Sequence, residues 1–249
     1  MLHDKKIGVV IPTRYDSSRL PGKVLLPFLG KPNLQHIIER VRRSGYVDEV
    51  ILAIAHDKDR QKLIDFAKVN DCKYYVGNKS IVIGRTLAAA NQFNIDIIVD
   101  MSHDCTLVDP DIIDNMLLAR EQHDADYVSN AKIRTYPDGF DIQVYTTKIY
   151  EHVFYKSDIT YPIHTGWNIE IASRFMDIKN VPFITKDLQN SHPDIRMVLD
   201  TEEDYKLLTA VFEHFGHNEF GWKEATEYVM EKELWRLTEK VITKHYSEG

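Results

Sequence analysis

The segment at residues 11–23, "IPTRYDSSRLPGK", gathers Arg14, Arg19 and Lys23 within ten residues. Ser17, Ser18 and the backbone N–H groups add hydrogen-bond donors around these fixed charges. Cations and donors in one loop suit the oxygens of a triphosphate. A solvated surface loop would have a similar composition, so the residue types alone leave both interpretations open. The segment matches neither a Walker A motif nor the Gly-x-Gly-x-x-Gly dinucleotide turn.

Two aspartates could hold a metal ion near such a loop. Asp104 lies in "SHDCTLVDPD" (residues 102–111), directly after an apolar run, and Asp200 ends "RMVLD" (residues 196–200). Carboxylates hold Mg²⁺, which keeps most of its waters and bridges to substrate phosphates. If Asp104 and Asp200 face each other, a triphosphate would complete an octahedral magnesium site. Asp200 could equally cap the helix that follows it, and sequence separation does not establish their proximity.

The elements that must position these residues alternate through the first half of the chain. Strands are expected at residues 7–12, 49–55, 73–77 and 96–102, and helices at 32–41, 63–67, 86–93 and 109–117. Apolar strands that alternate with helices are typical of a mostly parallel sheet with helices on both faces. Ligands bind beyond the carboxyl ends of such strands, so the loops after residues 11, 55, 76 and 101 should meet at one pocket.

The second half has shorter elements. Strands are expected at residues 127–130 and 140–146 around a turn at 136–139, and again at 180–185 and 196–200. Thr201 is the expected N-cap of a helix with an acidic first turn, and residues 222–246 should add one or two helices. We expect a single domain over residues 1–249, with a nucleotide-binding half (about 1–125), an acceptor-binding half (about 126–215) and a C-terminal helical tail (216–249).

Composition excludes several classes of protein. The 249-residue chain has a formal net charge of −7, which does not suit a general nucleic-acid binder. No apolar run approaches the roughly 18 residues that a membrane span needs, and the first residues carry no secretory signal. The two cysteines lie far apart and indicate neither a disulfide framework nor a zinc site. We expect a cytoplasmic protein with neither nucleic acid nor membrane as a partner.

Several ordered motifs resemble one enzyme family. They are "IPTRYDSSRLPGKVLLPFLGKP" (residues 11–32), "HDCTLVDP" (103–110), "YVSN" (127–130), "YPDG" (136–139) and "LDTEED" (199–204). Together they resemble the bacterial cytidylyltransferases of the sugar nucleotidyltransferase superfamily: 3-deoxy-manno-octulosonate cytidylyltransferase and the spore-coat polysaccharide protein F family. Over the whole chain, the resemblance to the spore-coat family is the nearer of the two. The resemblance covers roughly residues 5 to 215.

The resemblance implies a fold and a set of site residues. The fold would be a Rossmann-like, GT-A-like nucleotidyltransferase with a small β-ribbon extension, binding CTP with Mg²⁺. Arg14, Arg19 and Lys23 would be the catalytic cations, and Asp104 and Asp200 would hold the metal. The implied nucleotide-binding residues are Pro12, Thr13, Arg14, Ser18, Arg19, Lys23, Gly77, Asn78, Arg85 and Asp104.

The chain also departs from the family pattern at three places. His103 replaces the glycine before Asp104, and Thr106 replaces a proline. Residues 80–85, "SIVIGR", lack the acidic residues that usually precede the arginine. His103 and Thr106 keep the metal-binding aspartate and alter its surroundings. The last puts the contacts to the base, and the choice of acceptor, in doubt.

The implied reaction is attack by an acceptor oxygen on the α-phosphorus of CTP with release of pyrophosphate, for surface polysaccharide or capsule biosynthesis. The acceptor would be small and anionic: a sugar acid, or a phosphorylated molecule such as a sugar phosphate, a polyol phosphate or phosphoglutamine. Its contacts are expected from the second half, at Arg134, Tyr136, Asp138, His164, Trp167 and Lys186. His164 and Trp167 fit a packing role equally well.

Alternatives remain at the level of the sequence. A guanylyl- or uridylyltransferase acting on a sugar phosphate would share the loop and the aspartates, and so would a non-catalytic nucleotide-binding module. Relatives imply a homodimer, with residues 135–145 as a ribbon across the interface. The same residues could form an ordinary internal hairpin.

Overall fold

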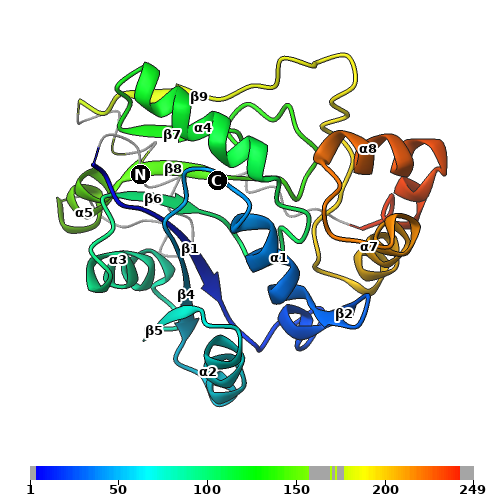
Figure 1. Ribbon diagram of the computed structural model, residues 1–249, viewed down its shortest axis with the longest axis horizontal. Coiled ribbons are helices and arrows are strands. Elements are labelled where there is room, and N and C mark those ends of the chain that lie inside the picture. Colours follow the sequence, from blue (N-terminus) through cyan, green and yellow to red (C-terminus); the bar gives the residue numbers. More distant parts are fainter. Residues whose placement is uncertain (1–3, 157–168, 170–171, 173–176, 242–249) are drawn as a thin grey trace.

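The computed structural model describes residues 4–156, 169, 172 and 177–241, and a sheet runs through its middle (Figure 1). In chain order, the strands of this sheet are β1 (Ile7–Thr13), β4 (Glu49–Ala55), β5 (Lys73–Gly77), β6 (Ile97–Asp100), β7 (Tyr127–Ser129), β8 (Gln143–Thr146) and β9 (Asn180–Pro182). Among the described residues their spatial order is β5-β4-β1-β6-β8-β7-β9. Only β8 runs antiparallel to its neighbours. The mostly parallel sheet predicted from the sequence is therefore confirmed.

Helices lie on both faces of the sheet (Figure 1). Their bounds are α1 (Asn33–Val41), α2 (Arg60–Val69), α3 (Val82–Gln92), α4 (Pro110–Gln122), α5 (Thr147–Lys156), α7 (Glu202–Phe215) and α8 (Trp222–Glu231), with short 3₁₀ helices η1 (Lys23–Leu25) and η2 (Leu234–Leu237). From β1, Ile7, Val9 and Ile11 enter a core shared with α1, α2, α4 and α7, whereas Val10 enters one shared with α3 and α5. In a strand that is buried on both faces, successive side chains enter the two cores alternately.

The carboxyl ends of the first parallel strands meet at one edge of the sheet. Thr13 at the end of β1 pairs with Ile54, and Ala55 at the end of β4 pairs with Gly77 of β5. On the other side of β1, Val10 pairs with Asp100, the last residue of β6. The loops that follow these strands therefore leave the sheet at the same edge, as the alternation of elements predicted.

Two elements of the first half differ in extent from the prediction. Helix α3 begins at Val82, before the expected residue 86, because Ile83 and Arg85 are already buried in its first turn. No side chain caps this helix, so the sequence carried no start signal there. Strand β6 ends at Asp100, since the chain turns away before Asp104.

Two strands of the second half are shorter than predicted, and one of them, β9, ends at Pro182 instead of residue 185. The expected strand at 140–146 forms only at β8, because the Asn130 side chain bonds Phe140 O (2.8 Å) and Ile142 N (2.8 Å) in place of a neighbouring strand. Of residues 135–145, only 143–145 lie in a strand, and this strand, β8, is an inner strand of the main sheet rather than a separate ribbon. The small two-stranded sheet lies elsewhere, between β2 (Pro27–Phe28) and β3 (Lys31–Pro32).

The prediction of a strand at residues 196–200 was wrong, because no strand forms there. Arg196 forms one isolated bridge with Asp138, and the residues after it bond to loops instead of a strand. Helix α7 then starts as predicted, since Thr201 caps it in a box with Asp204. Asp109 caps α4 as expected, with Pro110 in the first position.

Hydrogen bonds from Arg40 connect the chain after α7 to the first half of the protein. This arginine of α1 is fully buried, and its Nε donates to Val108 O at 2.6 Å. Its NH2 group donates to Phe220 O at 2.7 Å, and the guanidinium lies 4.9 Å from the centre of the Phe220 ring. Trp222 N–H at the start of α8 donates to Asp109 at 2.7 Å. The C-terminal helices therefore pack on the fold rather than extending from it.

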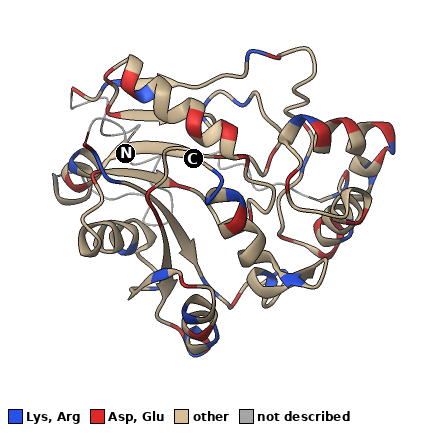
Figure 2. Ribbon diagram, viewed as in Figure 1, with Lys and Arg blue, Asp and Glu red and all other residues tan. Residues whose placement is uncertain are grey.

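Charged side chains of both signs are spread over the outer helices (Figure 2). Within the described ranges, no helix has the length and apolar character needed to span a membrane.

The division of the chain into two functional halves stays a prediction.

Candidate active site

The loop after β1 is closed by its own backbone. Tyr15 O accepts hydrogen bonds from Ser17 N at 3.0 Å and from Gly22 N at 3.1 Å. Gly22 has a φ of 72°, and a Cβ there would lie 3.1 Å from the Tyr15 hydroxyl, so a glycine suits this turn. Arg14, Ser18 and Arg19 are exposed on the loop, whereas Lys23, at its end in η1, is buried. The loop thus presents donors and cations to solvent above one buried amine.

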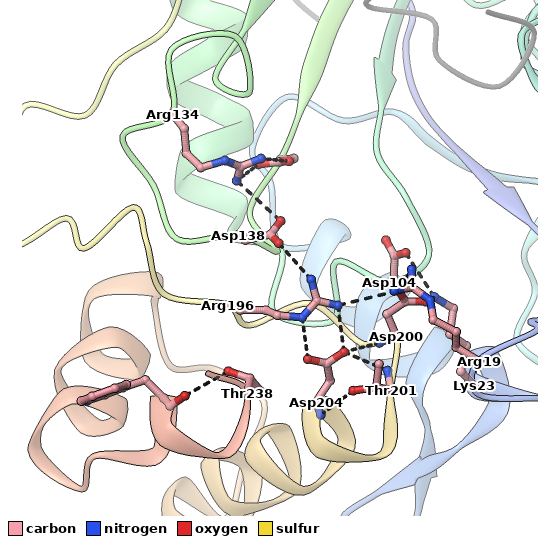
Figure 3. A network of polar contacts seen from close by, with 12 residues as sticks. Arg19, Lys23, Asp104, Arg134, Asp138, Arg196, Asp200, Thr201, Asp204 and Thr238 are labelled. Carbon is pink, nitrogen blue, oxygen red and sulfur yellow. Dashed lines mark hydrogen bonds and ion pairs between the residues drawn. The ribbon is translucent and has the colours of Figure 1, made fainter. Parts of the chain in front are cut away.

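Lys23 joins the two predicted metal ligands. Its Nζ lies 3.2 Å from Asp104 Oδ2 and 3.0 Å from Asp200 Oδ1. Arg19 forms an ion pair with the other oxygen of Asp200, and Figure 3 shows these side chains gathered at one point. Asp104 and Asp200 therefore face each other, although they come from opposite halves of the sequence.

Backbone contacts hold the two aspartates together. Leu199 N donates to Asp104 O at 2.9 Å, so the segment before Asp200 lies directly against the loop after β6. His103 Nδ1 bonds Pro12 O at 2.9 Å, and Asn33 Nδ2 donates to His103 O at 3.0 Å. These contacts fix three parts of the chain relative to one another: the end of β1, the end of β6 and the segment before α7.

Electrostatics keep Asp104 ionised and its neighbour His103 neutral. Burial alone would raise the pKa of Asp104, but the charges and hydrogen bonds around it, those of Lys23 first, together outweigh burial and lower the pKa to about 2. Burial, aided by the charge of Lys23, lowers the pKa of His103 to about 4. Because neutral His103 must donate from Nδ1 to the Pro12 carbonyl, its Nε2 is an acceptor.

The carboxylate pair fits a hard divalent cation. Its donors are oxygens, which Mg²⁺ prefers, and both converge on a position that a cation already occupies. Within the part of the chain that the structure describes, no group of three or more His, Cys, Asp or Glu side chains could hold a metal alone. Waters or substrate oxygens would have to supply the other ligands, as is usual for Mg²⁺.

The loop after β5 is held from beneath by Arg85. Its Nε donates to Ala53 O at 2.9 Å, and its NH1 group donates to Asn78 O at 2.5 Å and Lys79 O at 3.2 Å. Burial and the charge of Arg14 lower the pKa of Arg85 to about 10, so it remains charged at neutral pH. Arg85 is 3% exposed, which makes it a support of this loop more than a surface for a ligand.

The other residues predicted at the nucleotide lie around the same edge. Gly77 and the exposed Asn78 line a shallow hollow with His56 and Lys79. Asn78 Oδ1 accepts from Ser80 N at 2.8 Å, which shapes the turn. The buried Thr13 donates its hydroxyl to Ile11 O at 2.8 Å, so the side chain is committed to the backbone.

Arg196 is a central residue that the sequence did not reveal. Its Nε and NH2 groups bind the two oxygens of Asp204 at 2.8 and 3.0 Å, and its NH1 group donates to Asp138 at 3.3 Å. It also lies 3.7 Å from Asp200 (Figure 3). Asp204 in turn accepts from the backbone N–H groups of Asp200 (2.9 Å) and Thr201 (2.8 Å). The acidic residues four and eight positions after Arg196 were its only sequence signal.

The residues predicted to bind the acceptor divide into two groups. Arg134 binds Asp141 through two hydrogen bonds of 2.8 and 2.7 Å and lies 3.6 Å from Asp138. Asp138 connects this pair to Arg196 and so to the carboxylate site (Figure 3). Burial and the charge of Asp141 raise the pKa of Asp138.

Tyr136 and Lys186, the other two acceptor candidates among the described residues, are not brought to this network. Tyr136 is buried in the main core, where it stacks with Phe183 at 6.4 Å and meets Trp222 edge-on at 5.0 Å, as a packing residue does. Lys186 is exposed in the chain after β9. His164 and Trp167 lie outside the described residues.

Comparison with known proteins decides the family. A model of the cytidylyltransferase family matches residues 8–214. The chain belongs to this family. The match includes the loop after β1, both aspartates and Arg196, so the network described above lies within the part that the family shares.

Relatives of this chain include enzymes named for octulosonate. It is 33% identical over 132 residues to a 3-deoxy-manno-octulosonate cytidylyltransferase of Geobacter metallireducens, covering 52% of the chain and 47% of that protein. The chain thus spans about half the length of the octulosonate relatives it matches. A solved cytidylyltransferase from Leptospira borgpetersenii is 26% identical, with a TM-score of 0.84 over 96% of this chain and 100% of that one.

A more distant structure supports the fold. It is a CMP:2-keto-3-deoxy-manno-octonic acid synthetase complexed with CTP, 19% identical, with a TM-score of 0.63 over 85% of this chain and 100% of that one. The nucleotidyltransferase fold and the cytidylyltransferase family predicted from the motifs are therefore confirmed.

Proposed function

We propose that this protein transfers a cytidylyl group from CTP to a small acidic acceptor and releases pyrophosphate. The observation that carries the proposal is the meeting of Asp104 and Asp200 at Lys23, beneath a loop that exposes Arg14 and Arg19. Family membership agrees with it. A triphosphate laid along the loop would place its oxygens against these cations.

The proposed step is a displacement at phosphorus. An acceptor oxygen forms a bond to the α-phosphorus, the bond from that phosphorus to the oxygen bridging to the β-phosphate breaks, and pyrophosphate leaves with the electron pair. Any proton on the acceptor oxygen passes to solvent. Negative charge develops on the non-bridging and leaving oxygens, so placed cations supply most of the catalysis.

Each residue has a proposed part in this step. Arg14, Ser18 and Arg19 bind the phosphates from the exposed side of the loop, and Lys23 binds them from below. Gly77 and Asn78 border the base and ribose, on a loop that Arg85 supports. A magnesium ion held by Asp104 and Asp200 would add positive charge at the phosphates.

The acceptor proposed first is a sugar acid. Several curated relatives are named as cytidylyltransferases for 3-deoxy-manno-octulosonate or its 8-amino derivative. Arg134 offers a guanidinium on the acceptor side, and its contacts through Asp138 reach the carboxylate site. Motifs at residues 136–139 and 199–204 favour the spore-coat polysaccharide protein F type within the family, with a product for surface polysaccharide or capsule. Phosphorylated small molecules form the second class of acceptor.

A pyrophosphate-release screen tests the proposal. Purified protein with Mg²⁺ is given each of four nucleoside triphosphates together with a panel of sugar acids, sugar phosphates, polyol phosphates and phosphoglutamine. We expect release with CTP and one acceptor class, and little with the other nucleotides. Release with GTP or UTP would redirect the proposal to another nucleotide, and CTP binding without release for any pair would indicate a binding module.

A further inference from the structure

The amine of Lys23 occupies the position that the proposed metal ion would need. It lies within 3.2 Å of one oxygen from each aspartate. Arg19 pairs with the second oxygen of Asp200, and Arg196 lies 3.7 Å from that same oxygen. Both carboxylates therefore have cationic partners within the protein itself.

A divalent ion must compete with these partners for the carboxylates. The Lys23 side chain is 5% exposed, so its attraction to the two aspartates is weakly screened by water and salt. Mg²⁺ gives up its own waters reluctantly, and the protein offers it two carboxylates. An ion arriving alone gains little by displacing a buried amine that would be left without a partner.

Nucleotide phosphates change this balance. Arg19 is 41% exposed on the loop, and Ser18 beside it is exposed, so a triphosphate can reach this side of the site. Its oxygens form short charge-assisted hydrogen bonds with ammonium and guanidinium groups. Once Lys23 and Arg19 pair with phosphate, the oxygens of Asp104 and Asp200 are released.

We propose that Lys23 and Arg19 close the carboxylate pair to divalent ions until nucleotide phosphates engage these two cations, so that the ion and the nucleotide enter together. This inference rests on the proposed function, because it takes a nucleotide triphosphate as the ligand. It assigns Lys23 a second role, as the cation that holds the metal position before the nucleotide binds.

The test is the binding of Mn²⁺ to nucleotide-free protein, followed by the electron paramagnetic resonance signal of the free ion. We expect Lys23→Met to bind Mn²⁺ at least about tenfold more tightly than the wild type. Adding Asp104→Asn to Lys23→Met should reverse the gain. Lys31→Met is the matched control, because Lys31 is exposed and pairs with Glu39 away from the site. Equal Mn²⁺ affinity in the wild type and Lys23→Met would overturn the inference.

A thermal melt covers the case in which Lys23→Met folds poorly. Without nucleotide, the Tm of the wild type should be the same in MgCl₂ and in NaCl of equal ionic strength. The Tm of Lys23→Met, or of Lys23→Gln, should rise in MgCl₂ by several degrees more than that of the wild type. The wild type by itself can also contradict the inference. It would do so if, without nucleotide, it bound Mn²⁺ tightly or if MgCl₂ raised its Tm above the value in NaCl.

The outcome can be separated from that of the proposed function. If the wild type transfers cytidylyl groups and also binds Mn²⁺ tightly without CTP, the inference fails and the function stands. If the protein neither binds nor turns over a nucleotide, the function fails, and the inference fails with it even where Mn²⁺ binds as expected.

Discussion

Lys23 contacts two aspartates that lie 81 and 177 positions away from it in the sequence. Each aspartate follows an apolar segment and is fixed by backbone contacts, so their approach is a property of the fold rather than of flexible side chains. Removing Lys23 takes away its ion pair with the partly buried Asp104, whereas Asp200 keeps Arg19 and Arg196 as cationic partners. Such a loss is costly for both charge stabilisation and local structure.

Turnover should therefore depend both on the positive charge of Lys23 and on the negative charge of Asp104. We expect Lys23→Ala and Asp104→Asn each to lower turnover at least about tenfold, or about 1.4 kcal/mol in the barrier. Removal of a single group that stabilises transition-state charge typically costs more than this. The measurement is kcat for pyrophosphate release with CTP and the acceptor found in the screen. Lys31→Ala should keep normal turnover, and normal turnover in both site variants would refute the site assignment.

The sequence predicted the residues of this site better than their contacts. Motif similarity indicated Lys23, Asp104 and Asp200, but no spacing rule could show that they meet. Arg196 was missed because one of its partners, Asp138, lies 58 positions away and its own segment is neither helix nor strand. Arg85 was predicted as a nucleotide residue, yet its burial under the loop depends on the packing of α3 on the sheet.

At the scale of elements, residues 138–139 cross residues 196–197. This crossing connects the residues predicted to bind the acceptor to the carboxylates. Asp138 N donates to Ile195 O at 2.8 Å, and Met197 N donates to Asp138 O at 2.7 Å. Gly139 has a φ of 112°, and a Cβ there would lie 2.5 Å from Met197 O. The crossing needs a glycine at this position.

Gly139→Ala should therefore separate the two segments. We expect a loss of about 2–3 kcal/mol in the free energy of unfolding, from backbone strain and the displaced neighbour. Gly30→Ala is the control, since Gly30 also has a positive φ (76°) but nothing within 4 Å of the added carbon. Urea denaturation of both variants measures the difference. A loss for Gly139→Ala no larger than that for Gly30→Ala would show that the close approach is unimportant.

The contact of α1 with α7 should depend on pH through His36. Its ring is buried against Phe212, with 4.6 Å between ring centroids, and Nε2 lies 2.7 Å from Phe28 O. Burial lowers the pKa of His36 below its usual 6.5. Protonation therefore favours the unfolded chain, and stability is lost as the pH falls below about 6.5.

His36→Gln removes this titration. From pH 8 to pH 5, we expect the variant to lose less unfolding free energy than the wild type, as measured by urea denaturation at each pH. Equal losses in both proteins would contradict a lowered pKa of His36 in the folded state.

Elements with a clear local pattern were predictable, and the short apolar segment at 196–200 was not. β4 and β5 have the predicted bounds, and the bounds of β1 differ by one residue, because continuous apolar runs in parallel strands are read directly. The segment at 196–200 has the same apolar character, but its backbone partners are loops from other parts of the chain. Local pattern cannot show which partner a short apolar segment meets.

At the scale of the whole molecule, Arg40 connects the part of the chain that matches the family to residues beyond it. Its guanidinium bonds Val108 O, Asn218 O and Phe220 O at 2.6, 3.1 and 2.7 Å. Family similarity ends at residue 214, so it gave no information on this connection. The predicted homodimer stays a prediction, and sedimentation of the purified protein would test it.

Arg40→Met should weaken this connection. We expect the free energy of unfolding to fall by at least about 2 kcal/mol, because buried carbonyls lose their donor. Arg43→Met, at an exposed position of the same chain segment, should change it by less than about 0.5 kcal/mol. Urea denaturation of both variants measures the comparison, and equal small effects would show that the C-terminal segment does not depend on Arg40.

Transfer of label from CTP tests the central claim most directly. CTP labelled at the α-phosphate or at the γ-phosphate is incubated with protein, Mg²⁺ and the acceptor, and the products are separated by chromatography. We predict that the α-label joins the acceptor while the γ-label is recovered in pyrophosphate. Asp104→Asn should slow the transfer of the α-label and the release of the γ-label equally. Recovery of the α-label only in CTP, CDP or free CMP, with none on any acceptor of the panel, would contradict a cytidylyltransferase.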